Sequence, residues 1–553
     1  MKNKPVIFWI VITFFLAIPY LYFYISRGDP IFGNEMFSYL TIIISGVSFS
    51  LLVSKFLKAN FHSDHKGPAL IIYSSAVFLY SCFLFLIMVS NYNRMVSQSI
   101  DVNHYHIQVW QLSEFTVPSY NWSQHFEPIL FFVAPLYWLF KNPGILMLIQ
   151  AIVFISGAIP IYKIVKKTLS SRFIGLSLIF AYLAFGGTQF GIAYGFHPIM
   201  LFPTVFLWMY YFFIEKKIKL YFLFVLLSLM VKEEVSFIMF FWSIYLILFK
   251  KERLVGGVTL IASVAWYILC FHFIFPVFNP GGSGFGYWGQ YSQEYGTGIL
   301  GLLLFVVREP LEFLKTLITP SYKIDTFIQS FGSFGFLLFL YPPAFFIVIP
   351  SLMEKLLSSG IAAVNGTHYS AALTGVTIVA TIESMKKVLK KKFFIKIVEH
   401  PTLFMGSLLF YCAFFFNILY SFYAFSLLPT AQRTGYPVGN VSVEPSDKNL
   451  LFLSQVIDSI PKQASVAAQY QIIPHMNRHY NLLEDIPDSE ENADFVLVDT
   501  QLPPPVLTNT EILNKYLDDL DKSEKYELIV NNLGVVLFKR VDSQFNTSFY
   551  RGQ

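Results

Sequence analysis

The sequence contains many apolar segments that are each long enough to cross a lipid bilayer as a helix. About 20 apolar residues, rising about 1.5 Å per residue, span the hydrocarbon core. One stretch, from Phe173 to Ile214, contains no Asp, Glu, Lys or Arg. Because it is too long for a single crossing, it predicts two spans joined by a turn near Gly195-Phe196-His197-Pro198.

The composition agrees with a lipid environment. Only 13% of the residues are charged and 55% are hydrophobic, whereas soluble globular chains carry about 25% charged residues. We therefore predict an all-α polytopic transmembrane bundle of about 11 to 13 spans. The candidate spans are roughly 5–25, 38–57, 69–90, 143–163, 173–193, 198–214, 219–233, 235–249, 254–275, 326–341, 343–357, 370–385 and 402–424.

Basic residues gather in short segments between these spans, which predicts the orientation of the chain. The clusters are Lys216, Lys217 and Lys219, then Lys250, Lys251 and Arg253, and finally Lys386 to Lys396. Nucleic-acid binding also uses such clusters, but short basic loops between spans are the ordinary signal of the cytoplasmic side. We predict a multi-pass protein of the plasma (inner) membrane with a cytoplasmic N-terminus and no nucleic-acid partner. Segments 91–142, 193–198, 232–234, 276–325 and 358–369 then lie outside.

Three parts of the chain differ in character. Residues 1–68 are predicted to form an additional N-terminal transmembrane hairpin, and residues 69–425 a multispanning core with a large outer loop at 91–142. From residue 426 to 553 the apolar runs shorten and alternate, as in Phe495–Val498, and Asn531-Asn532-Leu533-Gly534 is typical of a hairpin turn. This tail predicts a small soluble α/β domain on the extracytoplasmic side.

Polar and ionisable residues collect in the segments predicted to lie outside. Ionisable groups at a bilayer are costly and usually mark a functional site. The candidate site residues are Asp101, His125, Glu127, His197, Lys232, Glu233, Glu234, His368 and Tyr369. Because topology brings all of them to one membrane face, we predict that they share a polar cavity, with Asp101, Lys232 and His197 lining it.

Each of these residues also has a structural interpretation. Asp101 is placed where it could cap a helix, and the Lys232-Glu233-Glu234 triplet could be an internal ion pair between two short helices. A lone histidine near a membrane is often only interfacial. No soluble-enzyme motif is present, and Asp519-Leu-Asp521 lies in a charged, helical segment that favours a solvated face over a metal site. No ligand spacing in the sequence predicts a metal site.

Several motifs together resemble domain of unknown function 2079, a prokaryotic family of multispanning membrane proteins. They are His125-Phe-Glu-Pro-Ile-Leu, Pro135-Leu-Tyr, Leu148-Ile-Gln-Ala, Gly157-Ala-Ile-Pro-Ile-Tyr, Phe196-His-Pro, Lys232-Glu-Glu, His368-Tyr, and in the tail Ser465-Val-Ala, Pro474-His, Arg478 and Ala493-Asp-Phe-Val-Leu-Val-Asp. The resemblance covers roughly residues 70 to 500. That family is similar in layout to class C glycosyltransferases, which take sugars from polyprenyl-phosphate carriers at the outer membrane face.

The resemblance implies a membrane glycosyltransferase whose first outer loop carries an acidic catalytic residue. It points to Asp101 as the base that accepts the acceptor's proton, with Glu127 second. The other candidates would bind the substrate, with Lys232, His197 or His368 near the anionic phosphate. The implied partners are membrane lipid and a lipid-linked sugar donor; a divalent metal is compatible with this chemistry, and no cofactor is demanded. The stretch Tyr105-His-Ile-Gln-Val-Trp110 departs from the family pattern, in which an acidic residue directly precedes the glutamine.

Two other classes of function remain open at this level. A transporter or flippase could move a lipid-linked or polar substrate through the same cavity, and the short, proline-broken hairpins suit it. A membrane scaffold could instead use its outer tail to bind a partner. The sequence does not give the sugar, the acceptor or the oligomeric state.

Overall fold

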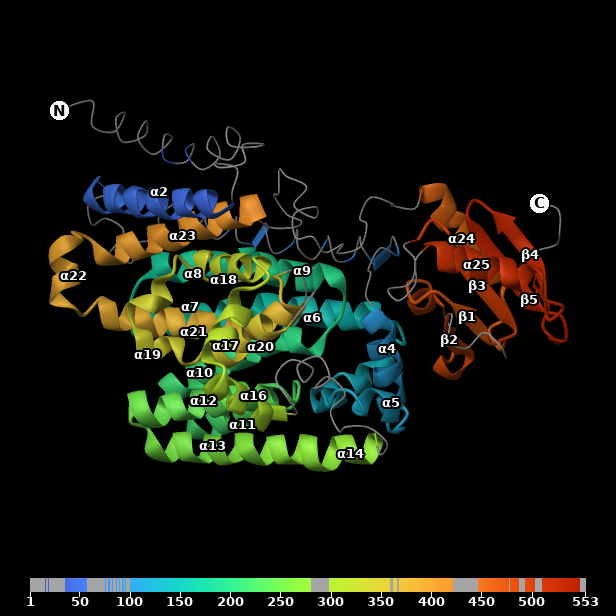
Figure 1. Ribbon diagram of the computed structural model, residues 1–553, viewed down its shortest axis with the longest axis horizontal. Helices are drawn as coiled ribbons and strands as arrows, with labels where there is room; N and C mark the ends of the chain where they lie inside the picture. Colours follow the sequence, from blue (N-terminus) through green and yellow to red (C-terminus); the bar gives the residue numbers. More distant parts are fainter. Residues whose placement is uncertain are drawn as a thin grey trace.

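A computed structural model describes residues 35–56, 100–279, 298–358, 362–365, 368–420, 446–476, 478–486, 493–502 and 510–547, with isolated positions in 15–18 and 75–95. The predicted spans 5–25 and 69–90 lie outside the described residues except at those positions. The described part is a mostly helical bundle followed by a small sheet domain (Figure 1).

The first elements that the structure describes over their full length are α2 and a group of short elements after it. These are α2 (Glu35–Phe56), α4 (Ile100–Ser113), α5 (Ser119–Trp122) and the 3-10 turns η2 (Pro128–Phe132) and η3 (Ala134–Trp138). The next helices are α6 (Gly144–Ser156), α7 (Ala158–Thr168), α8 (Arg172–Ala184), α9 (Gly186–Tyr194), η4 (Pro198–Leu201), α10 (Phe202–Ile214), α11 (Ile218–Leu229), α12 (Val235–Tyr245), the π-turn η5 (Leu246–Lys250), α13 (Arg253–Ile268), the π-turn η6 (Leu269–Ile274) and α14 (Phe275–Phe278). The predicted turn between Phe173 and Ile214 is confirmed, because α9 ends before His197 and η4 starts after it.

The second half of the bundle consists of shorter pieces. They are α16 (Gly298–Arg308), α17 (Pro310–Ile318), α18 (Tyr322–Gly332), η7 (Leu337–Leu340), α19 (Pro342–Phe345), α20 (Ile349–Leu357), η9 (His368–Ser370), α21 (Ala371–Val388), α22 (Lys392–Ile397) and α23 (Pro401–Tyr420). The prediction of continuous spans at 326–341 and 343–357 is wrong. The expected break between the two spans is present, because Pro342 and Pro343 start a new helix. Each predicted span is also interrupted inside: Gly335 and Phe336, with φ of 61° and 54°, separate α18 from η7, and α19 ends before α20 begins.

Two helices among the described residues are long and apolar enough to cross a membrane, Gly144–Thr168 and Arg253–Phe278. Six shorter apolar helices accompany them: Tyr39–Lys55, Arg172–Ala184, Pro198–Ile214, Ile218–Leu229, Val235–Lys250 and Pro401–Asn417. The total of about 11 to 13 spans stays a prediction, because several predicted spans are shorter or broken in the structure and others fall outside the described residues.

The tail forms a five-stranded sheet with the order β2-β1-β3-β5-β4. Its elements are α24 (Asp447–Ser459), β1 (Val466–Ala468), the 3-10 turns η11 (Ile473–His475) and η12 (Tyr480–Leu482), β2 (Leu483–Asp485), β3 (Phe495–Asp499), α25 (Thr510–Asp521), β4 (Tyr526–Asn532) and β5 (Val535–Arg540). β1 pairs in parallel with β2 and β3, and β5 runs antiparallel to β3 and β4. The predicted hairpin is confirmed, since Asn532 pairs with Val535 across Leu533-Gly534.

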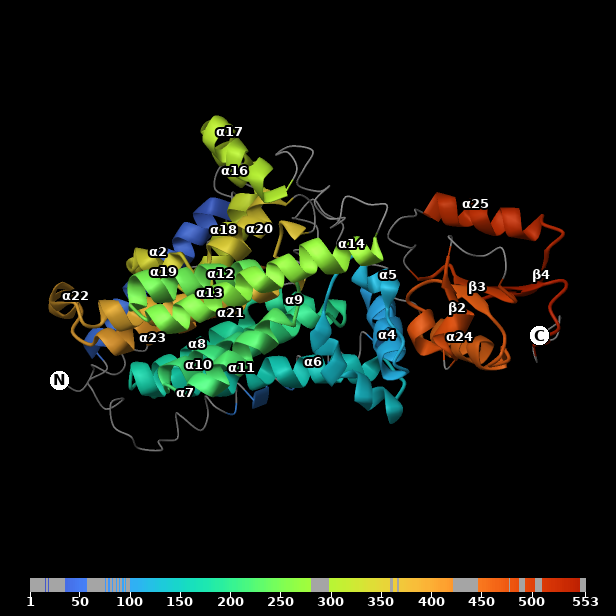
Figure 2. The same ribbon diagram turned by 90° about the horizontal axis from the view of Figure 1, so that it is seen from below.

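Helices cover both faces of this sheet (Figure 2). Along β3, Phe495 and Leu497 pack with α24, while Val496 and Val498 pack with α25. This alternation follows from the two-residue period of a strand. A strand covered on both faces is apolar throughout, which explains the continuous apolar run that the sequence shows there.

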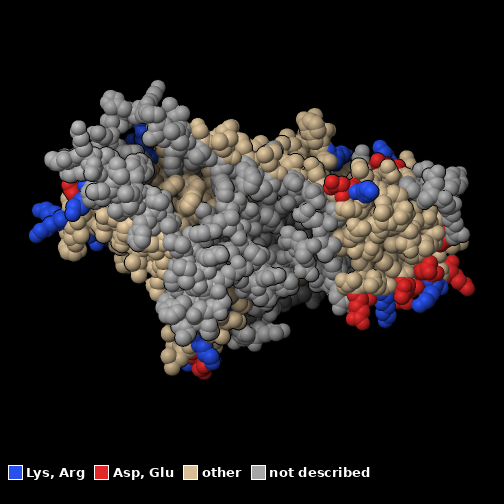
Figure 3. Space-filling model, turned by 90° about the horizontal axis from the view of Figure 1, so that it is seen from above, with Lys and Arg blue, Asp and Glu red and all other residues tan. Residues whose placement is uncertain are grey.

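The connections between the bundle helices lie at two opposite ends of the bundle. One end carries the lysine-rich connections, and the other carries His197, Lys232 and His368. Lys250 bonds Glu383 near the C-terminal ends of α12 and α21, and α22 with its lysines lies at the end of the bundle far from α4 and the tail domain (Figure 1). His197, Lys232 and His368 lie in connections at the α4 end. In Figure 3 most of the described surface of the bundle lacks charged side chains, whereas both signs of charge mark the tail domain.

Candidate functional site

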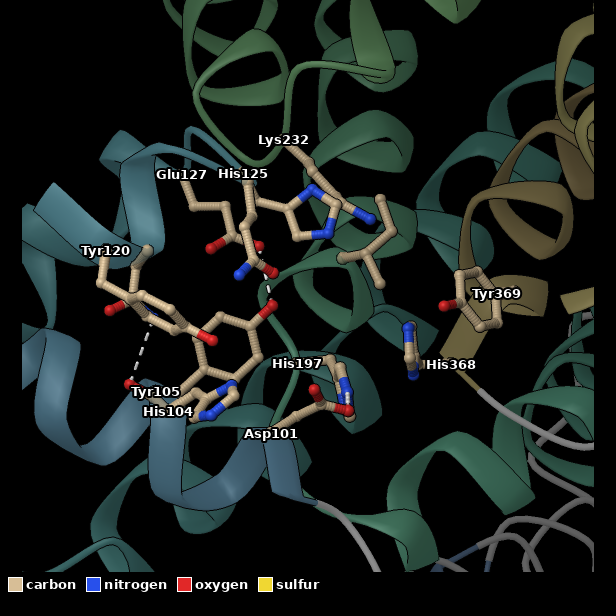
Figure 4. Close-up of a pocket in the computed structure, with 13 residues that line it drawn as sticks. Asp101, His104, Tyr105, Tyr120, His125, Glu127, His197, Lys232, His368 and Tyr369 are labelled. Atoms are coloured by element: carbon tan, nitrogen blue, oxygen red, sulfur yellow. Dashed lines mark hydrogen bonds and ion pairs between the residues drawn. The ribbon is translucent and has the colours of Figure 1, made fainter. Parts of the chain in front are cut away.

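A polar pocket lies where α4 and the 119–127 segment meet the helix connections at this end of the bundle (Figure 4). Seven of the predicted site residues line it: Asp101, His125, Glu127, His197, Lys232, His368 and Tyr369. The prediction that Asp101, Lys232 and His197 line one cavity is therefore confirmed. The remaining lining residues are His104, Tyr105, Tyr120, Asn121, Gln124 and Ile199.

Asp101 and His197 form a direct pair across the pocket. Asp101 lies in the first turn of α4, where a carboxylate is favoured by the helix dipole, and its Oδ2 is 2.8 Å from His197 Nε2. Burial alone would raise the pKa of Asp101, but the charge interaction and hydrogen bond with His197, with His368 and His104 nearby, hold it well below its usual value. Asp101 is therefore an ionised carboxylate across the physiological pH range.

The backbone around His197 is fixed by one buried glutamine. Gln150 Nε2 donates to the Gly195 carbonyl at 2.8 Å, and Gln150 Oε1 accepts from the His197 amide at 2.7 Å. Gly195 has φ of 141°, a conformation that a side chain disfavours. Gln150, fully buried, thus holds both ends of the turn that presents His197.

His368 is held face to face against His197. The two rings are stacked with centroids 3.6 Å apart and planes 14° apart. Burial, with His197 beside it, lowers the pKa of His368 well below its usual value, so its imidazole is neutral. Lys355 supports the segment that carries it, because its buried Nζ donates to the Val364 carbonyl at 2.9 Å and to Ser370 Oγ at 3.0 Å.

Two glycines of α9 allow the His368 turn to pack against this helix. A Cβ on Gly187 would lie 2.6 Å from the Cβ of Ser370, and one on Gly191 would lie 3.2 Å from the Cα of His368. Such distances leave no room for a side chain. The close approach of η9 to α9 therefore depends on glycine at both positions.

We expect Gly187→Ala to destabilise the protein by about 1–3 kcal/mol, the usual cost of adding atoms to a tightly packed site. The measurement is denaturant-induced unfolding of the purified protein in detergent. Gly257→Ala is the matched control, since nothing lies within 4 Å of a Cβ added there. Equal stability of the two variants would contradict the packing argument.

Glu127 is the second carboxylate of the pocket, and only 1% of it is exposed. Its Oε1 accepts a hydrogen bond of 2.8 Å from Tyr105 Oη on α4. Burial raises the pKa of Glu127 to about 7, because the attraction of His125 and Lys232 offsets only part of the cost of burying the charge. Unlike Asp101, Glu127 therefore exchanges a proton near neutral pH.

Of the Lys232-Glu233-Glu234 triplet, only Lys232 lines the pocket, and the two glutamates bind residues that line it. Glu233 accepts from His125 Nδ1 at 2.8 Å and from the Phe126 amide at 3.1 Å, which ties the 125–127 segment to the α11–α12 connection. Lys232 Nζ is 3.0 Å from Glu234 Oε2 and 6.0 Å from the centre of the Tyr369 ring. Glu233 and Glu234 do not line the pocket that the described residues form, and their predicted role in substrate binding stays a prediction.

Sequence reasoning missed Tyr105, Gln150 and Lys355, which position the residues that it did select. Lys355 left a usable signal, because it is a basic residue in a predicted span, where a charge needs a structural or functional reason. Gln150 left a similar signal, because it is a polar residue inside the predicted span 143–163 and belongs to the Leu148-Ile-Gln-Ala motif. Tyr105 left none, since its partner Glu127 is 22 positions away.

The tail domain contacts the same helix that supplies Asp101. His479 Nε2 is 3.1 Å from Glu114 Oε2, just after α4, and the rings of Tyr92 and His475 are stacked 4.4 Å apart. The tail therefore lies at the pocket end of the bundle, as Figure 1 shows.

A family model described as "Predicted membrane protein (DUF2079)" matches residues 111–537, which is more than half of the chain. The chain belongs to the DUF2079 family. This DUF2079 member is therefore a membrane protein, and the matched region includes every lining residue of the pocket from Tyr120 onward. Asp101, His104 and Tyr105 precede the matched region.

Solved structures that are similar to this chain include two crystal structures of ArnT from Cupriavidus metallidurans. The one bound to undecaprenyl phosphate has a TM-score of 0.43 and 10% identity to this DUF2079 member, covering 87% of this chain and 100% of that chain. The one in the apo state has a TM-score of 0.41 and 9% identity, covering 87% and 99%. No curated protein matches the sequence.

Proposed function

We propose that this protein transfers a sugar from a polyprenyl-phosphate carrier to an acceptor at the extracytoplasmic face of the plasma membrane. The proposal rests on one observation. A single pocket contains Lys232 and two carboxylates whose pKa values shift in opposite directions, Asp101 and Glu127. This pocket lies at the end of the bundle that lacks the basic loops. Groups whose surroundings separate their pKa values suit different roles in one reaction.

Glu127 is the better general base of the two carboxylates. A base works best when its pKa lies near the working pH, which holds for Glu127 and not for the strongly acidic Asp101. This reverses the order that the sequence favoured. The acceptor hydroxyl gives its proton to Glu127, and the acceptor oxygen bonds to the anomeric carbon of the sugar. The bond from that carbon to the phosphate oxygen breaks, and polyprenyl phosphate leaves.

Lys232 is placed to stabilise the phosphate that leaves. The departing polyprenyl phosphate gains negative charge as the glycosidic bond breaks, and a fixed ammonium group in a buried site offsets that charge. Lys232 is 5% exposed, and its contacts with Glu234 and the Tyr369 ring hold it beside the pocket.

The orientation in the membrane follows from the charge difference between the two ends. Short basic loops remain in the cytoplasm, so the clusters around Lys216, Lys250 and Lys386 place their end of the bundle inside. The pocket and the tail domain, at the other end, then face outward, and the N-terminus is cytoplasmic. A lipid-linked sugar reaches an outward-facing pocket from the outer leaflet.

The test uses purified full-length protein with a labelled polyprenyl-phosphate sugar and an envelope extract as the source of acceptor. We expect release of polyprenyl phosphate together with labelled acceptor, and a strong loss of both in Lys232→Met. Movement of the intact lipid-linked sugar across sealed vesicles without cleavage would identify a transporter instead. Asp101→Asn in the same assay distinguishes a required carboxylate from a dispensable one.

A further inference from the structure

Three side chains with metal-binding atoms meet beside the pocket, from three separate parts of the chain. A carboxylate oxygen of Asp101 and one ring nitrogen each of His197 and His368 all lie within 4.8 Å of one another. Figure 4 shows the three side chains adjacent to one another, away from Glu127. We propose that Asp101, His197 and His368 bind one divalent transition-metal ion, and that Zn²⁺ fits this ligand set.

The donor atoms decide the class of ion. Zn²⁺ binds imidazole nitrogen at about 2.0–2.1 Å and carboxylate oxygen at about 2.0–2.2 Å, and sites with three protein ligands keep a fourth position open. Mg²⁺ and Ca²⁺ prefer oxygen ligands, so two imidazoles disfavour them. His197 and His368 are 2% and 7% exposed, and all three residues line the pocket, so the fourth position would face it.

The backbone that carries the ligands is fixed from outside the cluster. Gln150 holds the turn at His197 through two hydrogen bonds. Gly191 allows the His368 turn to pack against α9, and Lys355 binds the chain on both sides of His368, at Val364 and Ser370. Supporting contacts of this kind orient the ligands of a metal site and contribute to its affinity.

Metal binding requires one adjustment of the side chains. An ion bound to an imidazole lies in the plane of that ring, and two parallel rings 3.6 Å apart cannot both contain the same ion in their planes. His368 would therefore rotate out of the stack while His197 stays beside Asp101. The 2.8 Å contact between His197 and Asp101 would lengthen as both ligands turn to the ion.

The positive charge of Lys232 does not prevent a second cation in the pocket. Its ammonium group is 3.0 Å from the Glu234 carboxylate, and the Asp101 carboxylate lies within the ligand set itself. The metal site does not depend on the proposed sugar transfer. Its test therefore measures binding and not activity.

The experiment is a Zn²⁺ titration of purified full-length protein in detergent, after removal of metal with a chelator, followed by calorimetry and by elemental analysis of the dialysed protein. We expect one high-affinity Zn²⁺ per chain. In Asp101→Asn and His368→Ala the affinity should fall by more than about 100-fold, because even supporting residues of metal sites cost about 10- to 100-fold. His104→Ala is the matched control, since His104 lines the same pocket without belonging to the ligand set.

Co²⁺ provides a second measurement that is independent of stoichiometry. Its visible absorption should report nitrogen and oxygen ligands in the wild type and should disappear in His368→Ala. If His368→Ala does not fold, His368→Cys keeps a ligand at that position and should bind Co²⁺ with an added sulfur-to-metal charge-transfer band. Absence of stoichiometric Zn²⁺ binding to the wild type, equal affinity in Asp101→Asn, or loss of binding in His104→Ala would overturn the proposal.

Discussion

Replacing Glu127 by Gln is expected to lower the rate of sugar transfer by about 100- to 10,000-fold, the range that a positioned general base contributes. Glutamine keeps the size of the side chain and can still accept a hydrogen bond from Tyr105, but it cannot take the proton of the acceptor. The measurement is the initial rate of release of polyprenyl phosphate at saturating donor. Glu312→Gln, an exposed carboxylate on α17, is the control and should leave the rate unchanged.

The same residue predicts the pH dependence. Because the pKa of Glu127 is raised to about 7, Glu127 is protonated below that pH and cannot act as a base. The rate should therefore fall by about tenfold per pH unit below about pH 7 and level off above it. The groups that set this pKa are Tyr105, His125, Lys232 and Glu233. A full wild-type rate in Glu127→Gln, or the same acidic limb in both proteins, would refute the assignment.

Glu383→Leu is expected to destabilise the protein by about 3–5 kcal/mol, the cost of removing one partner from a buried ion pair. Glu383 is fully buried and accepts hydrogen bonds from the hydroxyls of Tyr210 and Tyr245 and from Lys250, the latter at 2.9 and 3.0 Å. Its loss would leave an ammonium group and two hydroxyls without their acceptor. The measurement is the free energy of unfolding in detergent micelles.

A double variant separates the unpaired charge from lost packing. Glu383→Leu combined with Lys250→Met removes the charge on both sides and should recover part of the stability. Glu312→Leu, on the exposed surface, should change stability by less than about 0.5 kcal/mol. A Glu383→Leu protein as stable as the wild type would show that the cluster at the basic end of the bundle is not a stabilising contact.

Several features of the fold could be predicted from local sequence because local sequence causes them. The turn before His197 follows from an apolar stretch too long for one crossing. The hairpin follows from the Asn531-Asn532-Leu533-Gly534 segment, in which Gly534 adopts a positive φ without strain. The broken segments between residues 322 and 357 could be predicted only in part. Their prolines were visible, but the positive φ of Phe336, which helps to turn the chain there, has no signal in its residue type.

For the candidate site, the sequence predicted which residues take part and at which end of the bundle they lie. The structure shows which side chains contact each other there. The family resemblance pointed to Asp101 as the base, because it is an acidic residue in the first outer loop. Its contact with His197, 96 positions away, holds its pKa well below the usual value, which is why we propose Glu127 as the base. Burial raises the pKa of Glu127 to about 7, although His125, Lys232 and the hydrogen bond from Tyr105 oppose that shift.

The sequence by itself determined that this chain belongs in a membrane, that its costly polar groups gather at the end opposite the basic loops, and that a small sheet domain follows. These properties depend on composition, on segment length and on the alternation of helix direction, all of which are local or additive along the chain. Only the tertiary structure decided which carboxylate is acidic and which is near neutral, and which histidines meet. Proton affinity and metal ligation depend on distances of a few ångströms between groups far apart in sequence, and on how deeply the fold buries them.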